Sequence, residues 1–77
     1  MPPFSVLLHN DDKNDMADVV EAIVEITPHA QERAIQIMLE AHMRGLSLVL
    51  VTHRERAELY RDQFATKKLT VTIEPAP

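Results

Sequence analysis

Apolar residues recur along the chain at two different spacings, and the changes between them divide the sequence into six elements. Phe4, Val6 and Leu8 alternate with other residues, which predicts a strand over 4–9 with these three side chains on one face. The polar run 10–15 predicts a turn, because short polar side chains bond their own backbone. The spacing then changes to three and four residues, which predicts a helix capped by Asp15, with its inner face formed by Met16, Val19, Val20, Ile23 and Val24.

A second helix is predicted to begin at Thr27-Pro28, with Thr27 as N-cap and Pro28 in the first helical position. Its inner face is formed by Ala30, Ala34, Ile37, Met38 and Ala41, and His42 lies one turn beyond Met38. Gly45 is the only glycine of the chain, and its position suits the left-handed residue that ends many helices.

The last third of the chain predicts strand, helix and strand. Residues 46–51 are almost continuously apolar, which predicts a strand covered on both faces. Thr52-x-x-Glu55 matches a capping box, and the helix that follows turns Ala57, Tyr60 and Phe64 inward. Residues 69–74 alternate as a half-exposed strand. The order β-α-α-β-α-β predicts one α+β domain over 1–77, an open sandwich in which a small antiparallel three-stranded sheet carries helices on one side.

Composition limits the class of protein. The chain has 77 residues, 45% of them apolar and 26% charged, as in ordinary globular domains. Cysteine is absent, which excludes disulfides, thiolate metal sites and a cysteine nucleophile. No apolar run approaches the ~20 residues that cross a bilayer, and no signal-peptide pattern opens the chain. We therefore expect a cytoplasmic protein without a membrane partner.

Charge is unevenly distributed and indicates the kind of ligand. Residues 1–30 hold six acids and one base, a net charge of −5, whereas residues 31–77 hold seven bases and six acids. An exposed site built from the first third should favour a cation. Two Phe, one Tyr and no basic stripe give no support for nucleic-acid binding.

Three groups of residues are candidates for chemistry. Asn10, Asp11 and Asp12 directly follow a buried strand, and on composition alone their ordinary role is to shape the turn and cap the next helix. His42 lies on an apolar helix face, where a histidine bonded to a backbone carbonyl is the ordinary alternative. Met16 and Met38 suit a core, but methionine also lines surfaces that accept several apolar side chains.

Catalysis has little support in the sequence. His9, His42, Asp11 and Asp12 could ligate a metal, but so loose a cluster matches many proteins that bind none. The run 11–15 lacks the glycine and distal glutamate of a calcium loop. Ser5 and Ser47 lie in predicted strands without a nucleophile elbow. We therefore expect no enzyme, no metal and no cofactor, with a small metal-dependent enzyme as the remote alternative.

Taken together, the spacings of these residues resemble one family. The pattern runs from His9-Asn-Asp-Asp12 through Met16 and Val19-Val20 to Glu32-Arg-Ala34, and then through Met38, His42 and Gly45 to Glu55-x-x-Glu58. It resembles the ClpS adaptors from about residue 4 to residue 62 without a gap, and the closing strand also fits. That family has a fold related to the C-terminal domain of the ribosomal stalk protein, which agrees with the predicted order of elements.

The resemblance implies an adaptor that recognises N-degron substrates and delivers them to a Clp AAA+ unfoldase–protease. Asn10, Asp12 and His42 would contact the free α-amino group of the substrate's N-terminal segment, with Asp11 nearby. The first side chain, normally Phe, Tyr, Trp or Leu, would enter a pocket formed by Met16, Val19, Met38, Ala41 and Leu69. Glu55 would dock on the N-terminal domain of an unfoldase of ClpA or ClpC type.

The sequence departs from the family pattern at several positions. Asn14-Asp15 replaces a Thr-Pro, Ala41 replaces a larger aliphatic residue, and Tyr60 replaces a docking lysine. The alternative is therefore a module with the same fold that binds or regulates an unfoldase without recognising N-degrons.

Overall fold

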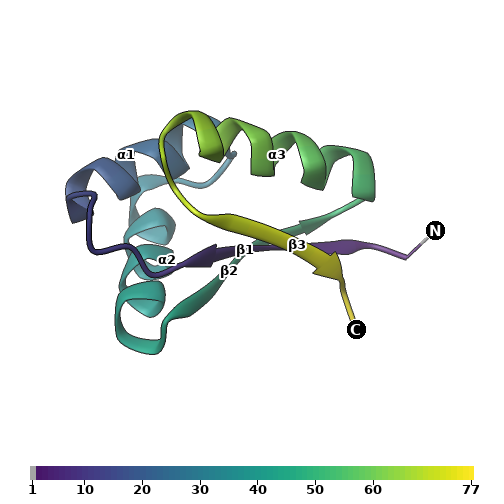
Figure 1. Cartoon of the computed structure of the whole chain (residues 1–77), viewed down its shortest axis with the longest axis horizontal. Coiled ribbons are helices and arrows are strands. Elements are labelled where there is room, and N and C mark those ends of the chain that lie inside the picture. Colours follow the sequence, from purple (N-terminus) through teal and green to yellow (C-terminus); the bar gives the residue numbers. More distant parts are fainter. Residues whose placement is uncertain (1) are drawn as a thin grey trace.

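The computed structural model describes residues 2–77 and contains six elements in the predicted order (Figure 1). They are β1 (Phe4–His9), α1 (Met16–Ile26), α2 (Gln31–Arg44), β2 (Leu46–Thr52), α3 (Arg54–Thr66) and β3 (Val71–Pro75). The order β-α-α-β-α-β is therefore confirmed, and the exact ends of several elements differ from the prediction.

The three strands form one antiparallel sheet with β1 in the centre, in the order β2-β1-β3. Leu8 of β1 faces Ser47 of β2 on one side and Val71 of β3 on the other. Because β1 pairs along both edges, its last residues are fixed from two sides. This matters for function, since the polar turn begins where β1 ends.

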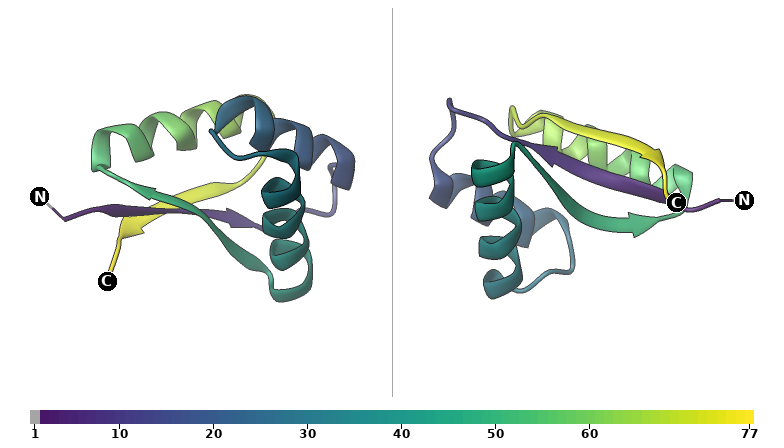
Figure 2. Two further views of the ribbon diagram at one scale, coloured as in Figure 1. Left: turned by 180° about the vertical axis from the view of Figure 1, so that it is seen from behind. Right: turned by 90° about the horizontal axis from the view of Figure 1, so that it is seen from below.

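The core lies between the sheet and the helices. α3 runs along one face of the sheet, whereas α1 and α2 pack against each other at the end where β1 leads into the polar turn (Figures 1 and 2). The most deeply buried side chains come from every layer: Val6, Leu8, Ile23, Ile37, Val49 and Phe64. As predicted, Val6 and Leu8 point to the core, and so do Ala57, Tyr60 and Phe64 of α3.

The predicted start of the second helix was wrong. α2 begins at Gln31 with Ala30 as N-cap, and Thr27 is instead the C-cap of α1. The hydroxyl of Thr27 donates to the carbonyl of Ile23 at 2.7 Å and accepts from the backbone N–H of His29 at 3.2 Å. Since the threonine side chain already ends one helix, it cannot cap the next, and Ala30 lies exposed before α2 rather than on its inner face.

The predicted capping box of α3 was also wrong. Thr52 is the last residue of β2, paired with Phe4, and α3 is capped by His53. The Nδ1 atom of His53 accepts the backbone N–H of Arg56 at 3.3 Å. The sheet extends one residue further than the pattern predicted, which moves the cap from Thr52 to His53.

β2 is covered on one face only, contrary to the prediction. Leu46 and Leu48 are each 41% exposed and Val51 is 47% exposed, while Ser47 and Val49 are buried. An irregularity in the pairing with β1 at Val49 adds a residue to β2, and the ring of His29 bonds the Val49 carbonyl at 2.7 Å. β2 is thus an edge strand whose bulged carbonyl is satisfied by a loop.

The start of α1 and the end of α2 lie where the sequence predicted them. Asp15 is the N-cap of α1, although its side chain makes no capping hydrogen bond. Gly45 ends α2 with a positive φ of 85°, the left-handed conformation that was predicted from its position. On the outer side of α1, Val24 is 40% exposed, so it does not belong to the inner face as predicted.

Candidate functional site

The polar turn after β1 is anchored to two other parts of the chain. The backbone N–H of Asn10 donates to the carbonyl of Gly45 at 3.0 Å, and that of His9 donates to the carbonyl of Thr70 at 3.0 Å. The first bond ties the turn to the end of α2, which carries His42. The second ties it to the segment before β3, which carries Leu69. Three regions distant in sequence therefore meet at the end of β1.

Within the turn, Asp11 accepts two hydrogen bonds. Its Oδ1 accepts from the backbone N–H of Lys13 at 2.7 Å, and its Oδ2 accepts from the side-chain amide of Asn14. The bond from Lys13, followed by the one from Asn14, holds the pKa of the Asp11 carboxyl below its ordinary value, because both stabilise the ionised form. Asp11 therefore stays negatively charged across the neutral and mildly acidic range.

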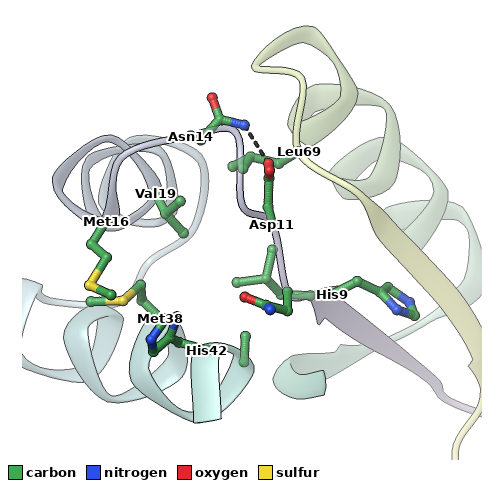
Figure 3. A pocket seen from close by; sticks show the side chains of 11 residues that line it. His9, Asp11, Asn14, Met16, Val19, Met38, His42 and Leu69 are labelled. Atoms are coloured by element: carbon green, nitrogen blue, oxygen red, sulfur yellow. Dashed lines mark hydrogen bonds between the residues drawn. The ribbon is translucent and has the colours of Figure 1, made fainter. Parts of the chain in front are cut away.

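A hollow lies between this turn and the two helices (Figure 3). It holds about 320 Å³ of space not filled by atoms, part of it open to solvent, and about 30 Å³ of this can hold the centre of a water molecule. The enclosed interior of the hollow is therefore small. The hollow is lined by Leu8, His9, Asn10, Asp11, Asn14, Met16, Val19, Met38, Ala41, His42 and Leu69.

Both polar and apolar side chains line the hollow. Asn10, Asp11 and Asn14 come from the turn, and His42 comes from the last turns of α2. The apolar wall consists of side chains that are buried, from α1, α2 and the α3–β3 connection: Val19, Met38, Ala41 and Leu69. Met16 stands at the rim with 46% of its surface exposed, and its side chain points toward that of Met38 (Figure 3). Such a site suits a ligand that joins a cationic group to a bulky apolar one.

The structure brings most of the predicted site residues together. Asn10, Asp11 and His42 share the hollow with all five predicted pocket residues, Met16, Val19, Met38, Ala41 and Leu69. Asp12 does not line it, and its side chain is exposed. Asp11 and not Asp12 therefore lines the hollow, and the predicted contact of Asp12 with an α-amino group stays a prediction.

Three lining residues were not predicted as site residues. Leu8 was assigned to the core, which it also joins. His9 lines the hollow, but its ring points away and its Nε2 lies 2.7 Å from the hydroxyl of Thr72 (Figure 3). Asn14 was noted only as a departure from the family pattern. Its membership of the same polar run as Asn10 and Asp11 is the one signal in the sequence that could have included it.

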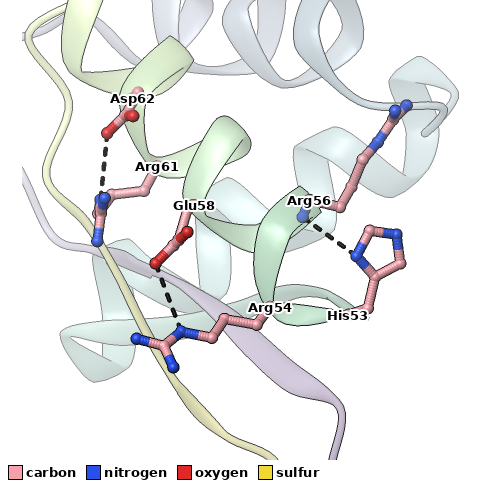
Figure 4. Close-up of polar contacts among 6 residues, drawn as sticks. All are labelled: His53, Arg54, Arg56, Glu58, Arg61 and Asp62. Carbon is pink, nitrogen blue, oxygen red and sulfur yellow. Dashed lines mark hydrogen bonds and ion pairs between the residues drawn. The ribbon is translucent and has the colours of Figure 1, made fainter. Parts of the chain in front are cut away.

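The predicted docking residue lies elsewhere. Glu55 is exposed in the first turn of α3, beside a shallow groove that also includes His53, Arg56, Leu59 and Asp62. Polar contacts link successive turns here, such as Arg54 to Glu58 at 3.5 Å (Figure 4). The guanidinium of Arg54 lies 5.8 Å from the ring of Phe4, so α3 begins beside the start of β1. Six residues of strand, roughly 20 Å, separate that point from the turn at Asn10.

The directions of the His9 and His42 side chains bear on the alternative of a metal site. The rings of His9 and His42 point in different directions (Figure 3), and among residues 2–77 no three His, Asp or Glu side chains gather as metal ligands. In that same described part of the chain, no helix has the length and apolar character needed to span a membrane.

Comparisons with known proteins agree with this geometry. The family model of the ATP-dependent Clp protease adaptor protein ClpS matches residues 1–72. The Clp protease adapter ClpS of Gloeobacter violaceus is 43% identical over 76 residues, which cover 97% of this chain and 82% of that protein. The chloroplastic Clp protease adapter of Arabidopsis thaliana is 36% identical over 75 residues, covering 96% of this chain and 47% of that longer protein.

A solved structure shares the fold over nearly the whole chain. Agrobacterium tumefaciens ClpS2 bound to L-phenylalaninamide superposes with a TM-score of 0.91 and 25% sequence identity. The match covers 97% of this chain and 98% of the other. The sheet, the three helices and their order are therefore those of a solved ClpS structure.

Proposed function

Since this chain belongs to the ClpS family of Clp protease adaptors, we propose that it binds the free α-amino group and bulky hydrophobic first residue of N-degron substrates and delivers them to a Clp AAA+ unfoldase. The family consists of adaptors and not of enzymes, so the prediction of a non-catalytic protein is confirmed. The observation that carries the finer proposal is the hollow itself, in which hydrogen-bond acceptors and an apolar wall line the same space.

The polar side chains of the hollow supply the hydrogen-bond acceptors that a terminal ammonium needs. The ammonium has three N–H donors, while Asn10, Asp11 and a neutral His42 each offer an acceptor. Asp11 retains a negative charge because its pKa is lowered by its own turn. Charge-assisted hydrogen bonds contribute about 1.5–3 kcal/mol each. An acetylated or internal residue lacks this charge, so it should bind poorly.

The apolar side chains of the hollow supply the remaining affinity. Burying one large side chain against Val19, Met38 and Leu69 contributes about 1.5–3 kcal/mol. After association costs, a complex near the micromolar range, about −8 kcal/mol, is a reasonable expectation. L-phenylalaninamide, bound by the Agrobacterium relative, carries both a free α-amino group and a benzyl side chain, and thereby supports the same ligand class here.

Delivery requires a second surface, and we propose the first turn of α3 for it. Glu55 is exposed there, with Leu59 one turn further along and 47% exposed. This surface begins near the start of β1, whereas the hollow lies at the end of β1, so substrate and unfoldase need not compete for space. The N-terminal domain of a ClpA- or ClpC-type unfoldase is the proposed partner. The cytoplasm remains the predicted location, although relatives also include chloroplastic proteins.

A titration with short peptides tests the proposal. Peptides beginning Phe or Leu should bind, those beginning Ala should bind at least tenfold more weakly, and an acetylated Leu peptide should not bind. Equal, weak binding of all four peptides, including the acetylated control, would refute amine recognition. It would favour the alternative of a module that engages the unfoldase without reading N-degrons.

A further inference from the structure

The side chain of Asn14 joins two segments that are far apart in the sequence. Its amide nitrogen donates to Oδ2 of Asp11 and, at 3.1 Å, to the backbone carbonyl of Lys68. A side-chain amide carries two N–H hydrogens, so both donors of Asn14 are used. The residue is half-buried at the edge of the hollow, where Figure 3 shows it beside Asp11 and Leu69.

The two partners of Asn14 belong to two different segments that contribute to the hollow. Asp11 belongs to the amine-binding turn, where its other oxygen accepts the Lys13 N–H. The Lys68 carbonyl belongs to the peptide unit that leads into Leu69, whose own N–H donates to the carbonyl of Phe64 at 3.2 Å. That peptide unit is therefore held by Asn14 at one atom and by the end of α3 at the other.

The backbone at this point needs external support. Lys68 has φ of 61°, the left-handed conformation, which a side chain disfavours and which only this non-glycine residue adopts in the described chain, 2–77. Leu69 follows at once and is 5% exposed against the hollow. A hydrogen bond to the Lys68 carbonyl thus fixes the position of an apolar wall residue.

We propose that Asn14 is a positioning residue that couples the amine-binding turn to Leu69. The acceptors of the turn and the apolar side chain of Leu69 then keep the spacing that one ligand requires. The inference rests on the proposed function and deepens it, because it gives a role to a residue that acts through its neighbours. Both amide hydrogens of Asn14 are used within the protein, and its amide oxygen, the atom that could accept from an ammonium, points away from Asp11 (Figure 3). Asn14 acts through Asp11 and Leu69.

The charge of Asp11 at pH 7 does not depend on Asn14, and this distinguishes a positioning role of Asn14 from an electrostatic one. Removing the Asn14 donor takes away one of the bonds that lower the Asp11 pKa, so the pKa should rise toward its ordinary value. That value, about 3.9, is still far below neutrality, and Asp11 remains ionised at pH 7. Weaker binding at pH 7 would therefore come from lost geometry and not from lost charge.

Two substitutions test the coupling. Asn14→Asp keeps the shape but replaces the donor by a carboxylate, which repels both Asp11 and the Lys68 carbonyl, and Asn14→Ala removes both bonds. The Kd for a Leu-beginning peptide should rise about tenfold in Asn14→Ala and further in Asn14→Asp, with the far-UV spectrum unchanged. Asp15→Ala is the matched control, because the neighbouring Asp15 side chain makes no capping bond. Its Kd should stay within about twofold.

Double-mutant cycles distinguish positioning from general damage. In an Asp11→Ala or a Leu69→Ala background, Asn14→Ala should cost about threefold or less, since one end of the link is already lost. Full additivity with both partners, or an unchanged Kd in both Asn14 variants, would overturn the inference.

Measurements without ligand keep this inference separate from the proposed function. In Asn14→Ala, NMR should show a raised titration midpoint for the Asp11 carboxyl and shifted methyl signals of Leu69. A change at only one of these sites would refute the coupling. A wild-type protein that binds no free amino terminus would instead refute the proposed function, while these two signals would still decide whether Asn14 links the walls.

Discussion

Truncating Met16 should change which first residues the hollow admits. The enclosed interior of the hollow is small, about 30 Å³, so a bulky side chain must displace part of the wall. Met16 is the wall residue best able to move, because it is 46% exposed and unbranched. A ligand branched at Cβ places a methyl group close to this rim, whereas Leu and Phe branch one carbon further in.

The magnitude follows from these observations. Forcing an extra methyl group into a packed site costs about 1–3 kcal/mol, which corresponds to a preference for Leu over Ile of roughly 5- to 150-fold. Met16→Ala should reduce that preference to about threefold or less. A fully buried methionine would lose about 2–5 kcal/mol of stability on truncation, and the exposure of Met16 reduces the expected loss to about 1 kcal/mol.

Fluorescence anisotropy with peptides beginning Leu, Ile, Val and Phe measures the preference directly. Met43→Ala is the matched control, since Met43 is on α2, 80% exposed and outside the hollow. It should leave every Kd unchanged. A Leu-to-Ile ratio in Met16→Ala equal to that of the wild type would refute the gate. So would a wild type that binds both equally, in which case the space left by Ala41 becomes the explanation.

Three further outcomes are expected. His42→Ala should bind a Leu peptide more weakly than the wild type does, because the substitution removes one acceptor for the ammonium, and an unchanged Kd would remove His42 from amine recognition. Glu55→Lys should abolish co-purification with the unfoldase and leave the peptide Kd unchanged. The control Glu32→Lys makes the same charge change in the first turn of α2 and should alter neither co-purification nor the peptide Kd. Co-purification of the unfoldase with Glu55→Lys would show that Glu55 is not a docking residue. His53→Ala should lower the free energy of unfolding by about 1 kcal/mol in urea titrations while Thr52→Ala does not lower it through the cap, and the reverse ranking would restore the capping box at Thr52.

Local pattern was sufficient for the order of elements and for most of the candidate site. Alternation in β1 predicted the buried positions of Val6 and Leu8, and the single glycine predicted the left-handed end of α2. These features depend on neighbours within a few residues, and such neighbours can be read from sequence. Most residues of the hollow were also found, because Asn10, Met16, Met38 and His42 lie at spacings that resemble a family.

Tertiary structure decided what depends on contacts between distant segments. β2 looked apolar enough to be covered twice, but only one of its faces is covered, which leaves Leu46 and Leu48 exposed. His29, twenty residues earlier, binds the bulge of β2 at Val49. Asp11 and Asp12 are equivalent in a polar run, and only the bonds from Lys13 and Asn14 place one of them at the hollow. The link from Asn14 to Lys68 spans 54 residues, so no local pattern could predict it. Two groups form a hydrogen bond only if the fold brings them close together, and the local sequence pattern does not give the distance between two remote segments.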